Sequence, residues 1–201
     1  MLAVGRDVYC DSALIVTTTL KKLGGNLPTS PADAAFQDWG NATFQGVIAT
    51  IPAAKLEPGF VADRASIFPA VKRPDFASLR PSALAEFRAR CTQVEEQFLG
   101  HGGTFIGGEQ LSLADVHVVW VLRWALMSLG VAMEPGFGKE DFPRMWRLLG
   151  ALPEAAPEVL GSEEAIEAVK DGEDAASGFE VDGKDPLGIE AGAMVTVESS
   201  E

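Results

Sequence analysis

Residues 104–130 read TFIGGEQLSLADVHVVWVLRWALMSLG, and this stretch decides the fold. Ser112 followed three residues later by Asp115 has the S-x-x-[DE] form of a capping box, in which each side chain hydrogen-bonds the other residue's backbone amide. Apolar residues then follow almost all the way round the expected helix, and Gly130 is a natural stop. A helix with no polar face is buried on all sides, so we predict that this segment is the central helix of a helical domain.

The same helix is too short and too polar to cross a membrane. Its apolar run from Val116 to Val131 is shorter than the roughly 20 residues that a span needs, and it carries His117 and Arg123. A buried guanidinium needs a carboxylate or carbonyl partner. For His117 and Arg123 two interpretations remain open, a structural ion pair and a role in substrate binding.

The charge of the chain is concentrated at one end. The 201 residues carry a net charge of −13, and the stretch from Glu154 to Glu201 holds 14 acidic and two basic residues. The rest of the chain is therefore close to neutral. We expect no nucleic-acid partner, because proteins that bind nucleic acids need basic patches to neutralise phosphates.

The few cysteines and histidines indicate neither disulfides nor a metal site. The two cysteines, Cys10 and Cys91, make no disulfide framework, and the two histidines lie far from them with no ligand spacing. The N-terminal residues lack the charged and apolar regions of a signal peptide. We therefore predict a cytoplasmic protein without a metal.

Further helices are expected on both sides of the central one. Pro81 is well placed at the first position of a helix that Gly100 closes, and its apolar residues recur in steps of three and four along one face. That face consists of Leu84, Phe87, Cys91, Val94 and Phe98. Four other segments have helical patterns: one from Asp33 to Pro52, one near residues 61–67, one from residues 141–143 to Gly150, and one over residues 163–170. Residues 193–197 alternate like a short strand.

The motifs around the central helix resemble a known family. Phe105-Ile106-Gly107-Gly108, then Leu111-Ser112-Leu113-Ala114-Asp115, then an apolar helix, resemble the signature of the glutathione-transferase C-terminal domain. In that family the capping box begins a buried helix and serves folding, which implies a structural role for Ser112 and Asp115. The finer pattern resembles a branch from filamentous fungi. It consists of Trp120, Arg123, Trp124, Pro135-Gly136-Phe137 and Phe142-Pro143.

Residues 5–15 resemble the last β-hairpin and third helix of the family's thioredoxin-like domain. In the family an acidic-or-Gln–Ser pair at this turn holds the γ-glutamyl end of glutathione, which implies glutathione binding by Asp11 and Ser12. The chemistry suits this role, because a helix N-terminus offers free amides to a carboxylate. A plain helix cap is the alternative interpretation.

Three features of the family have no counterpart in the sequence: its first strand, its first helix with the catalytic Tyr, Ser or Cys, and its cis-proline. The sequence therefore assigns no catalytic residue. Cys10 has two interpretations, a reactive thiol beside a helix N-terminus and a buried strand-end residue, and we favour the buried one. By resemblance, Phe36, Trp39, Trp120 and Arg123 would line the pocket for an electrophile. Core packing is the alternative for Phe36 and Trp39.

We therefore expect a mainly α protein, in which a glutathione-transferase C-terminal helical bundle (residues 31–152) follows a partial thioredoxin-like β-hairpin–helix (residues 1–25) and precedes an acidic extension (residues 153–201). The resemblance implies an enzyme that uses glutathione on a small apolar electrophile, for conjugation, isomerisation or elimination in fungal secondary metabolism. The alternative function is a non-catalytic protein-interaction module. An exposed hairpin edge favours a partner that covers it, and we expect a homodimer.

Overall fold

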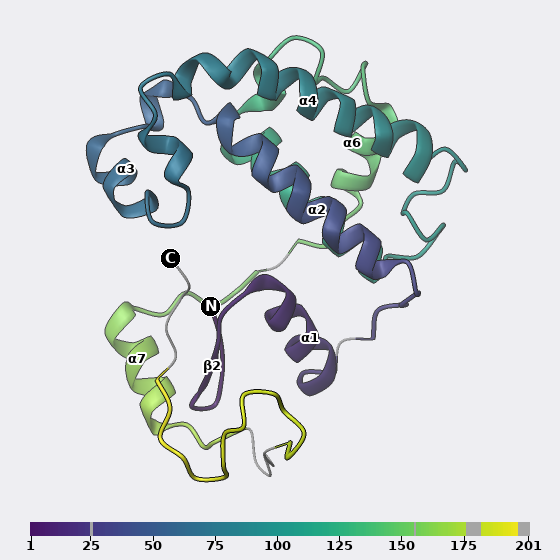
Figure 1. Cartoon of the computed structure of the whole chain (residues 1–201). Coiled ribbons are helices and arrows are strands. Elements are labelled where there is room, and N and C mark those ends of the chain that lie inside the picture. The colour runs from purple at the N-terminus through teal and green to yellow at the C-terminus, as the bar shows by residue number, and fades with distance from the viewer. Residues whose placement is uncertain (25, 155, 176–181, 197–201) are drawn as a thin grey trace. The chain divides into compact units, whose positions relative to one another are not determined.

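The computed structural model describes residues 1–24, 26–154, 156–175 and 182–196. It is mainly helical, as predicted, with a two-stranded antiparallel sheet among the described residues (Figure 1). The chain divides into two compact units, Asn26–Glu154 and a second unit made of Met1–Gly25 together with Ala155–Glu201. No helix in the described ranges has both the length and the apolar character that a membrane span requires.

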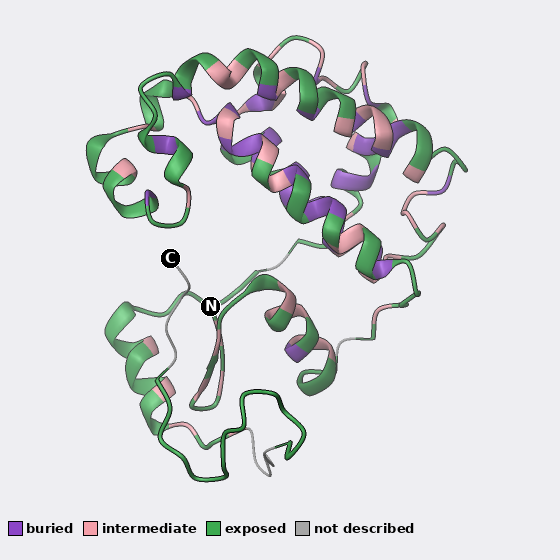
Figure 2. Cartoon of the chain, in the orientation of Figure 1, coloured by how far each residue is buried: buried purple, intermediate pink, exposed green. Residues whose placement is uncertain are grey.

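The unit Asn26–Glu154 is built of helices joined by short turns. Its α-helices are α2 (Asp33–Val47), α3 (Pro58–Arg64), α4 (Arg80–Gln93), α5 (Leu113–Arg123) and α6 (Pro143–Gly150). Between α2 and α4 lie the 3₁₀ turns η1 (Ile48–Thr50), η2 (Ala53–Lys55), η3 (Pro69–Lys72) and η4 (Phe76–Leu79). The helices α4 and α5 each continue into a π-helical turn, η5 (Val94–Phe98) and η6 (Trp124–Ser128), and η7 (Val131–Met133) follows. Figure 2 shows that the buried residues gather where these helices face one another.

The start of α5 carries the predicted capping box, which the structure confirms. The Asp115 carboxylate accepts hydrogen bonds from the Ser112 amide at 2.9 Å and the Ser112 hydroxyl at 2.6 Å. Its other oxygen accepts from the Ile106 amide at 2.7 Å. Asp115 is fully buried, and a buried carboxylate is tolerated only when it is well hydrogen-bonded. These bonds therefore fix the Gly-rich loop and the helix start together.

The prediction that α5 is buried on all sides is wrong for one face. Val118, Val121 and Leu122 are buried, but Trp120 is 37% exposed, and Arg123 is exposed as well. Met127 in η6 continues this exposed face. Apolar residues around the whole circumference give no asymmetry from which an outer face can be predicted. The packing of α5 against α2 decides which face is covered.

The helix α2 lies close against α5 because it has a glycine at the contact. Gly40 is buried, and a Cβ atom at this position would lie 2.3 Å from the backbone oxygen of His117. Real Cβ atoms do not approach an oxygen so closely, so no other residue fits without moving the two helices apart.

The π-helical turn η5, which continues α4, is hydrogen-bonded to the start of α6. Glu95 in this turn is buried, and its carboxylate accepts hydrogen bonds from the backbone amides of Arg144 at 3.1 Å and Met145 at 2.9 Å. These amides belong to the first turn of α6, where backbone donors lack partners within the helix. Glu95 therefore caps α6 from a distant part of the chain.

The predicted face of α4 is confirmed, since Phe87, Cys91 and Val94 are buried and Leu84 and Phe98 are half-buried.

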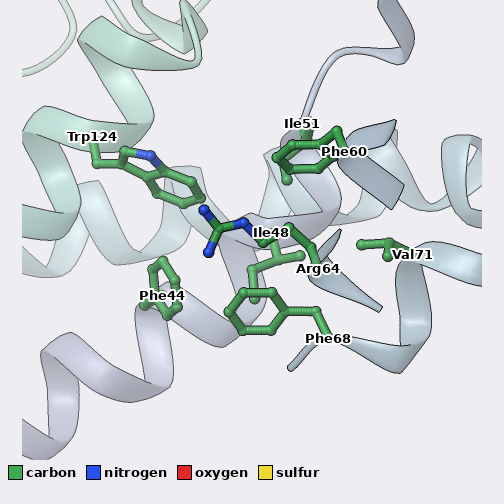
Figure 3. A pocket seen from close by; sticks show the side chains of 8 residues that line it. All are labelled: Phe44, Ile48, Ile51, Phe60, Arg64, Phe68, Val71 and Trp124. Carbon is green, nitrogen blue, oxygen red and sulfur yellow. The ribbon is translucent and has the colours of Figure 1, made fainter. Parts of the chain in front are cut away.

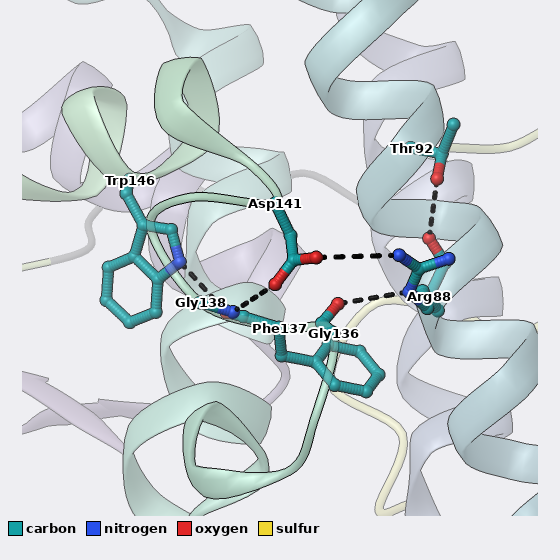
Figure 4. Close-up of polar contacts among 7 residues, drawn as sticks. All are labelled: Arg88, Thr92, Gly136, Phe137, Gly138, Asp141 and Trp146. Carbon is teal, nitrogen blue, oxygen red and sulfur yellow. Dashed lines mark hydrogen bonds and ion pairs between the residues drawn. The ribbon is translucent and has the colours of Figure 1, made fainter.

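The loop between η7 and α6 is fastened to the outer side of α4 (Figure 4). The Arg88 Nε donates to the carbonyl oxygen of Gly136 at 3.1 Å, and its guanidinium lies 3.7 Å from the Asp141 carboxylate. The other Asp141 oxygen accepts from the Gly138 amide at 3.1 Å. Gly136 has a positive φ of 84°, a conformation that favours glycine.

In the second unit the predicted hairpin and helix are present. The strands β1 (Leu2–Val4) and β2 (Asp7–Tyr9) pair antiparallel with Ala3 opposite Val8, and α1 (Ser12–Lys22) follows. The acidic extension supplies α7 (Ser162–Asp171), and its next residues meet the hairpin turn, where the Arg6 amide donates to the Glu173 carbonyl oxygen at 3.0 Å. The strand expected at residues 193–197 is not formed over residues 193–196, and Val197 lies outside the described residues.

Candidate functional site

A pocket of about 270 Å³ lies in the unit Asn26–Glu154, beside the C-terminal part of α2 (Figure 3). Aromatic side chains from separate segments form its walls: Phe44 of α2, Phe60 of α3, Phe68 and Trp124. The buried side chains of Ile48, Ile51 and Val71 also line it. Such an apolar lining favours an apolar ligand.

The walls are held by contacts among the aromatic rings. The ring of Phe44 lies 5.1 Å from Trp124 and 5.7 Å from Phe68, centroid to centroid. Trp124 is the first residue of the π-helical turn η6, and the Trp124 carbonyl oxygen accepts a hydrogen bond from the Leu129 amide at 3.0 Å. Single π-helical turns occur often at functional sites. Here the turn begins at the residue that forms one wall.

Arg64 brings a positive charge to this apolar pocket. Its guanidinium points between Phe44, Phe68 and Trp124 (Figure 3). The Arg64 Nε lies 3.1 Å from the Asp63 carboxylate, and the Asp63 side chain is 70% exposed. This exposed pair involves the Nε side of the guanidinium.

Phe36 and Trp39 lie in the N-terminal half of α2, and neither lines this pocket. Both pack on Phe98 with edge-to-face geometry, at 5.1 Å and 5.3 Å between ring centroids. The Trp39 indole donates to the Gln93 side chain at 2.7 Å, and Trp39 belongs to the buried core. Phe36 also lines a second pocket, of about 280 Å³, together with Ser112.

Trp120 and Arg123 lie on the exposed face of α5. The Trp120 ring packs 5.2 Å from Phe44, so it supports the wall of the first pocket from outside. Arg123 is exposed, and the need for a buried partner therefore does not arise. The structure thus places Trp120 next to the pocket and leaves the other three predicted pocket residues away from it.

Asp11 and Ser12 form the start of α1 in the second unit. The Asp11 Oδ1 accepts from the amides of Ala13 at 2.8 Å and Leu14 at 3.2 Å, so Asp11 makes the helix cap that was the alternative interpretation. Asp11 has a positive φ of 76°, which is unusual for a residue other than glycine. Both Asp11 and Ser12 are exposed. The Oδ2 of Asp11 and the amide and hydroxyl of Ser12 therefore face solvent at a helix N-terminus.

Cys10, which precedes this cap, is exposed. The favoured interpretation of Cys10 as a buried strand-end residue is therefore wrong. The strand ends one residue earlier, at Tyr9, which leaves Cys10 beyond the paired register of the hairpin.

His117 is a buried titratable residue at the contact between α2 and α5. Burial lowers the pKa of its imidazole, and the nearby Asp33 carboxylate opposes this shift. The structure thus favours a neutral ring, which does not support the structural ion pair that the sequence left open for His117.

The described residues contain no group of three or more His, Cys, Asp or Glu side chains that could hold a metal ion. Comparison with known families matches residues 44–158, more than half of the chain, to a domain of unknown function, DUF7962. The chain belongs to the DUF7962 family. No curated protein and no solved structure matches it.

The DUF7962 match covers the whole of the pocket around Phe44, since its lining residues extend from Phe44 to Trp124. Asp11, Ser12, Phe36 and Trp39 lie outside the matched range. The apolar pocket with Arg64 is therefore part of the DUF7962 domain itself.

Sequence reasoning missed most of this DUF7962 pocket. Phe44 falls within the helical pattern from Asp33 to Pro52, which indicates no pocket, and Trp124 was noted only in the pattern that resembles the fungal branch. Phe60 and Phe68 come from the segment bracketed by Pro58 and Pro69, whose aromatic residues had no helical period to mark them. The one available signal was an arginine in a segment otherwise rich in apolar residues.

Proposed function

We propose that this chain is a glutathione-transferase-like protein of the cytoplasm, which brings glutathione to a small apolar electrophile. The observation that carries the proposal is the aromatic pocket of the DUF7962 domain, because an apolar pocket of this kind suits such a co-substrate. The sequence motif from Leu111 to Asp115 supports a glutathione-transferase-type helical bundle, and its capping box is formed as the resemblance implies.

The glutathione part of the proposal rests on the start of α1. Glutathione carries an ammonium group and a carboxylate at its γ-glutamyl end. The amides of Ala13 and Leu14 are occupied by Asp11, and the Ile15 amide donates to the Asp11 carbonyl oxygen. The Ser12 amide and hydroxyl are therefore the donors of this turn that a ligand carboxylate would use, with the Asp11 Oδ2 accepting from the ammonium group.

The bound thiol would then react with the electrophile, in a conjugation, an isomerisation or an elimination. In a conjugation the glutathione sulfur forms a bond to an electrophilic carbon, and the thiol proton passes to solvent. We assign no side chain to this proton transfer. A cysteine thiol is itself a few per cent ionised at pH 7 and strongly nucleophilic, so the proposed conjugation needs no further group to activate the sulfur.

Titration calorimetry with glutathione tests this proposal directly. We expect binding by the full chain and a loss of about tenfold in affinity for Ser12→Ala, which removes a hydrogen bond to a charged group. Ser162→Ala is the matched control, since Ser162 begins α7 in the same unit and is also exposed. Absence of binding at millimolar glutathione, or equal affinities for the chain and Ser12→Ala, would remove the basis for the site.

A non-catalytic interaction module is the second candidate, and the exposed face of α5 and η6 supports it. Trp120 and Met127 are 37% and 49% exposed, and Arg123 lies between them in sequence. Trp and Arg are enriched at the centres of protein interfaces.

For the homodimer that we expect, sedimentation velocity should give the mass of a dimer for the unchanged chain. The double variant Trp120→Ser/Met127→Ser should give the mass of a monomer. A monomer at every concentration would contradict this assignment.

A further inference from the structure

We propose that the pocket around Phe44 binds a molecule with an apolar body and a carboxylate group, and that Arg64 binds the carboxylate. The inference rests on the proposed function in one respect only, since it takes this pocket as the site of the co-substrate. It adds the chemical class of that molecule, which an apolar lining alone does not give.

The exposure of the lining residues gives the pocket a direction. Ile48, Ile51 and Val71 are each 6% exposed and form its inner side. Phe60 is 37% exposed and the Arg64 side chain 48% exposed, which places both at the opening. A ligand that fits this gradient buries its apolar end and keeps its polar end at the opening, where part of its hydration remains.

The size of the pocket limits the apolar body. An engineered cavity of about 150 Å³ lined by Leu, Ile and Phe holds one benzene molecule. The present pocket has a volume of about 270 Å³. It therefore has room for one aromatic ring with a short aliphatic chain, or for an aliphatic chain of similar volume.

The charge at the opening selects the polar group. Of the described residues that line the pocket, Arg64 is the one with a charged side chain. A guanidinium has five N–H donors in a planar fork, and the Asp63 carboxylate, 3.1 Å from the Nε, lies on its solvent side. The two terminal amino groups are directed between the aromatic walls (Figure 3).

Neither of two alternative partners, an aromatic ring or Asp63, gives Arg64 a strong interaction. The cation–π pairs recorded within the described ranges involve Arg88 and Arg90. The exposed pair with Asp63 is weak, since surface ion pairs contribute about 0–1 kcal/mol. The terminal amino groups of Arg64 are thus suited to accept a new partner, and a carboxylate matches the fork with two parallel hydrogen bonds.

The test compares two probes of equal shape, 4-phenylbutyrate and 4-phenylbutan-1-ol, which differ in the carboxylate. Quenching or enhancement of tryptophan fluorescence, together with calorimetry, measures their affinities for the full chain without glutathione. We expect the acid to bind about tenfold more tightly than the alcohol, the difference that one good hydrogen bond to a charged group makes. In Arg64→Gln this preference should disappear while the affinity for the alcohol stays unchanged.

Matched variants locate the effect. Arg73→Gln removes another exposed arginine that pairs with a nearby aspartate, Asp75 at 2.7 Å, outside the pocket, and should behave as the unchanged chain. Phe60→Ala should weaken the acid and the alcohol equally, because it removes part of the opening without changing its charge. Arg64→Lys should keep part of the preference, since it retains the charge and loses the fork.

The outcomes separate this inference from the proposed function. Ser12→Ala should leave the binding of both probes unchanged, whether or not glutathione binds. Equal affinities for acid and alcohol, or equal losses of both in Arg64→Gln, would overturn the role of Arg64. Absence of binding by either probe at millimolar concentration would overturn the assignment of the pocket, and loss of glutathione binding alone would count only against the proposed function.

Discussion

At the scale of single residues, the two cysteines differ in their surroundings and should differ in reactivity. Cys10 is exposed, whereas Cys91 is fully buried in the α4 face, where burial raises the pKa of its thiol to about 12. The thiolate is the reactive form. At pH 8, a disulfide reagent such as dithionitrobenzoate should therefore modify one thiol per chain within seconds to minutes, and the second only when urea unfolds the protein.

The control for this prediction is Cys10→Ser, which should abolish the fast reaction and leave the slow one.

The raised pKa of Cys91 also makes the free energy of unfolding depend on pH. The folded state favours the neutral thiol, so the contribution of Cys91 is complete below about pH 9 and is lost as the pH rises toward 12, by at most about 1.4 kcal/mol per pH unit. Equal reactivity of both thiols in the native chain would contradict the buried position of Cys91.

At the scale of elements, the contact between α2 and α5 reverses a rule of helix propensity. Glycine weakens an isolated helix by about 1 kcal/mol relative to alanine, which predicts that alanine should stabilise α2 at both Gly40 and Gly46. At Gly40, however, the new Cβ would lie 2.3 Å from the His117 carbonyl oxygen. Overpacking of this kind costs about 1–3 kcal/mol. We expect Gly40→Ala to lower the free energy of unfolding in urea titrations.

Gly46 is the matched control in the same helix. The nearest atoms to a Cβ there belong to the carboxylate of Glu86, at 3.4 Å, an ordinary contact with the end of a flexible side chain. Gly46→Ala should therefore stabilise the protein by up to about 1 kcal/mol. If both variants stabilised the fold equally, the close approach of α2 and α5 would be refuted.

The elements also show which parts of the fold follow from sequence and which do not. The capping box of Ser112 and Asp115 and the apolar face of α4 were predictable because both depend on residues within one or two helical turns. The exposed side of α5 was not predictable, since an apolar residue such as Trp120 fits a covered or an uncovered face. The cap that Glu95 makes on α6 joins residues 49 and 50 positions apart, and no local pattern marks it.

The pocket belongs to the unpredictable part for the same physical reason. Its walls come from separate segments between Phe44 and Trp124, and their meeting depends on how α3 folds back beside α2. Asp11 at the start of α1, by contrast, was predictable as a helix cap, because its bonds reach only two and three residues ahead. Its role toward glutathione stays a prediction, since a cap and a ligand site share the same local sequence.

At the scale of the whole molecule, the hydrophobic core lies within one unit. The core cluster among the described residues extends from Trp39 to Leu149, inside the unit Asn26–Glu154. The other unit contains a two-stranded hairpin, and such a hairpin is marginally stable by itself in water. The hairpin turn is joined instead to the acidic extension, through the antiparallel bridge between Gly5 and Asp174.

This division predicts that a fragment of residues 26–154 folds without the rest of the chain, because it retains the core, the capping box at Asp115 and the cap at Glu95. Circular dichroism should show a cooperative thermal transition and helical content undiminished per residue. The fragment should also bind 4-phenylbutyrate with the affinity of the full chain, since all lining residues of the pocket remain, and it should lose glutathione binding, since Asp11 and Ser12 are removed. A fragment that melts without a transition would show that residues 1–25 and 155–201 complete the core. A fragment that folds and still binds glutathione would place that site within residues 26–154 and away from α1.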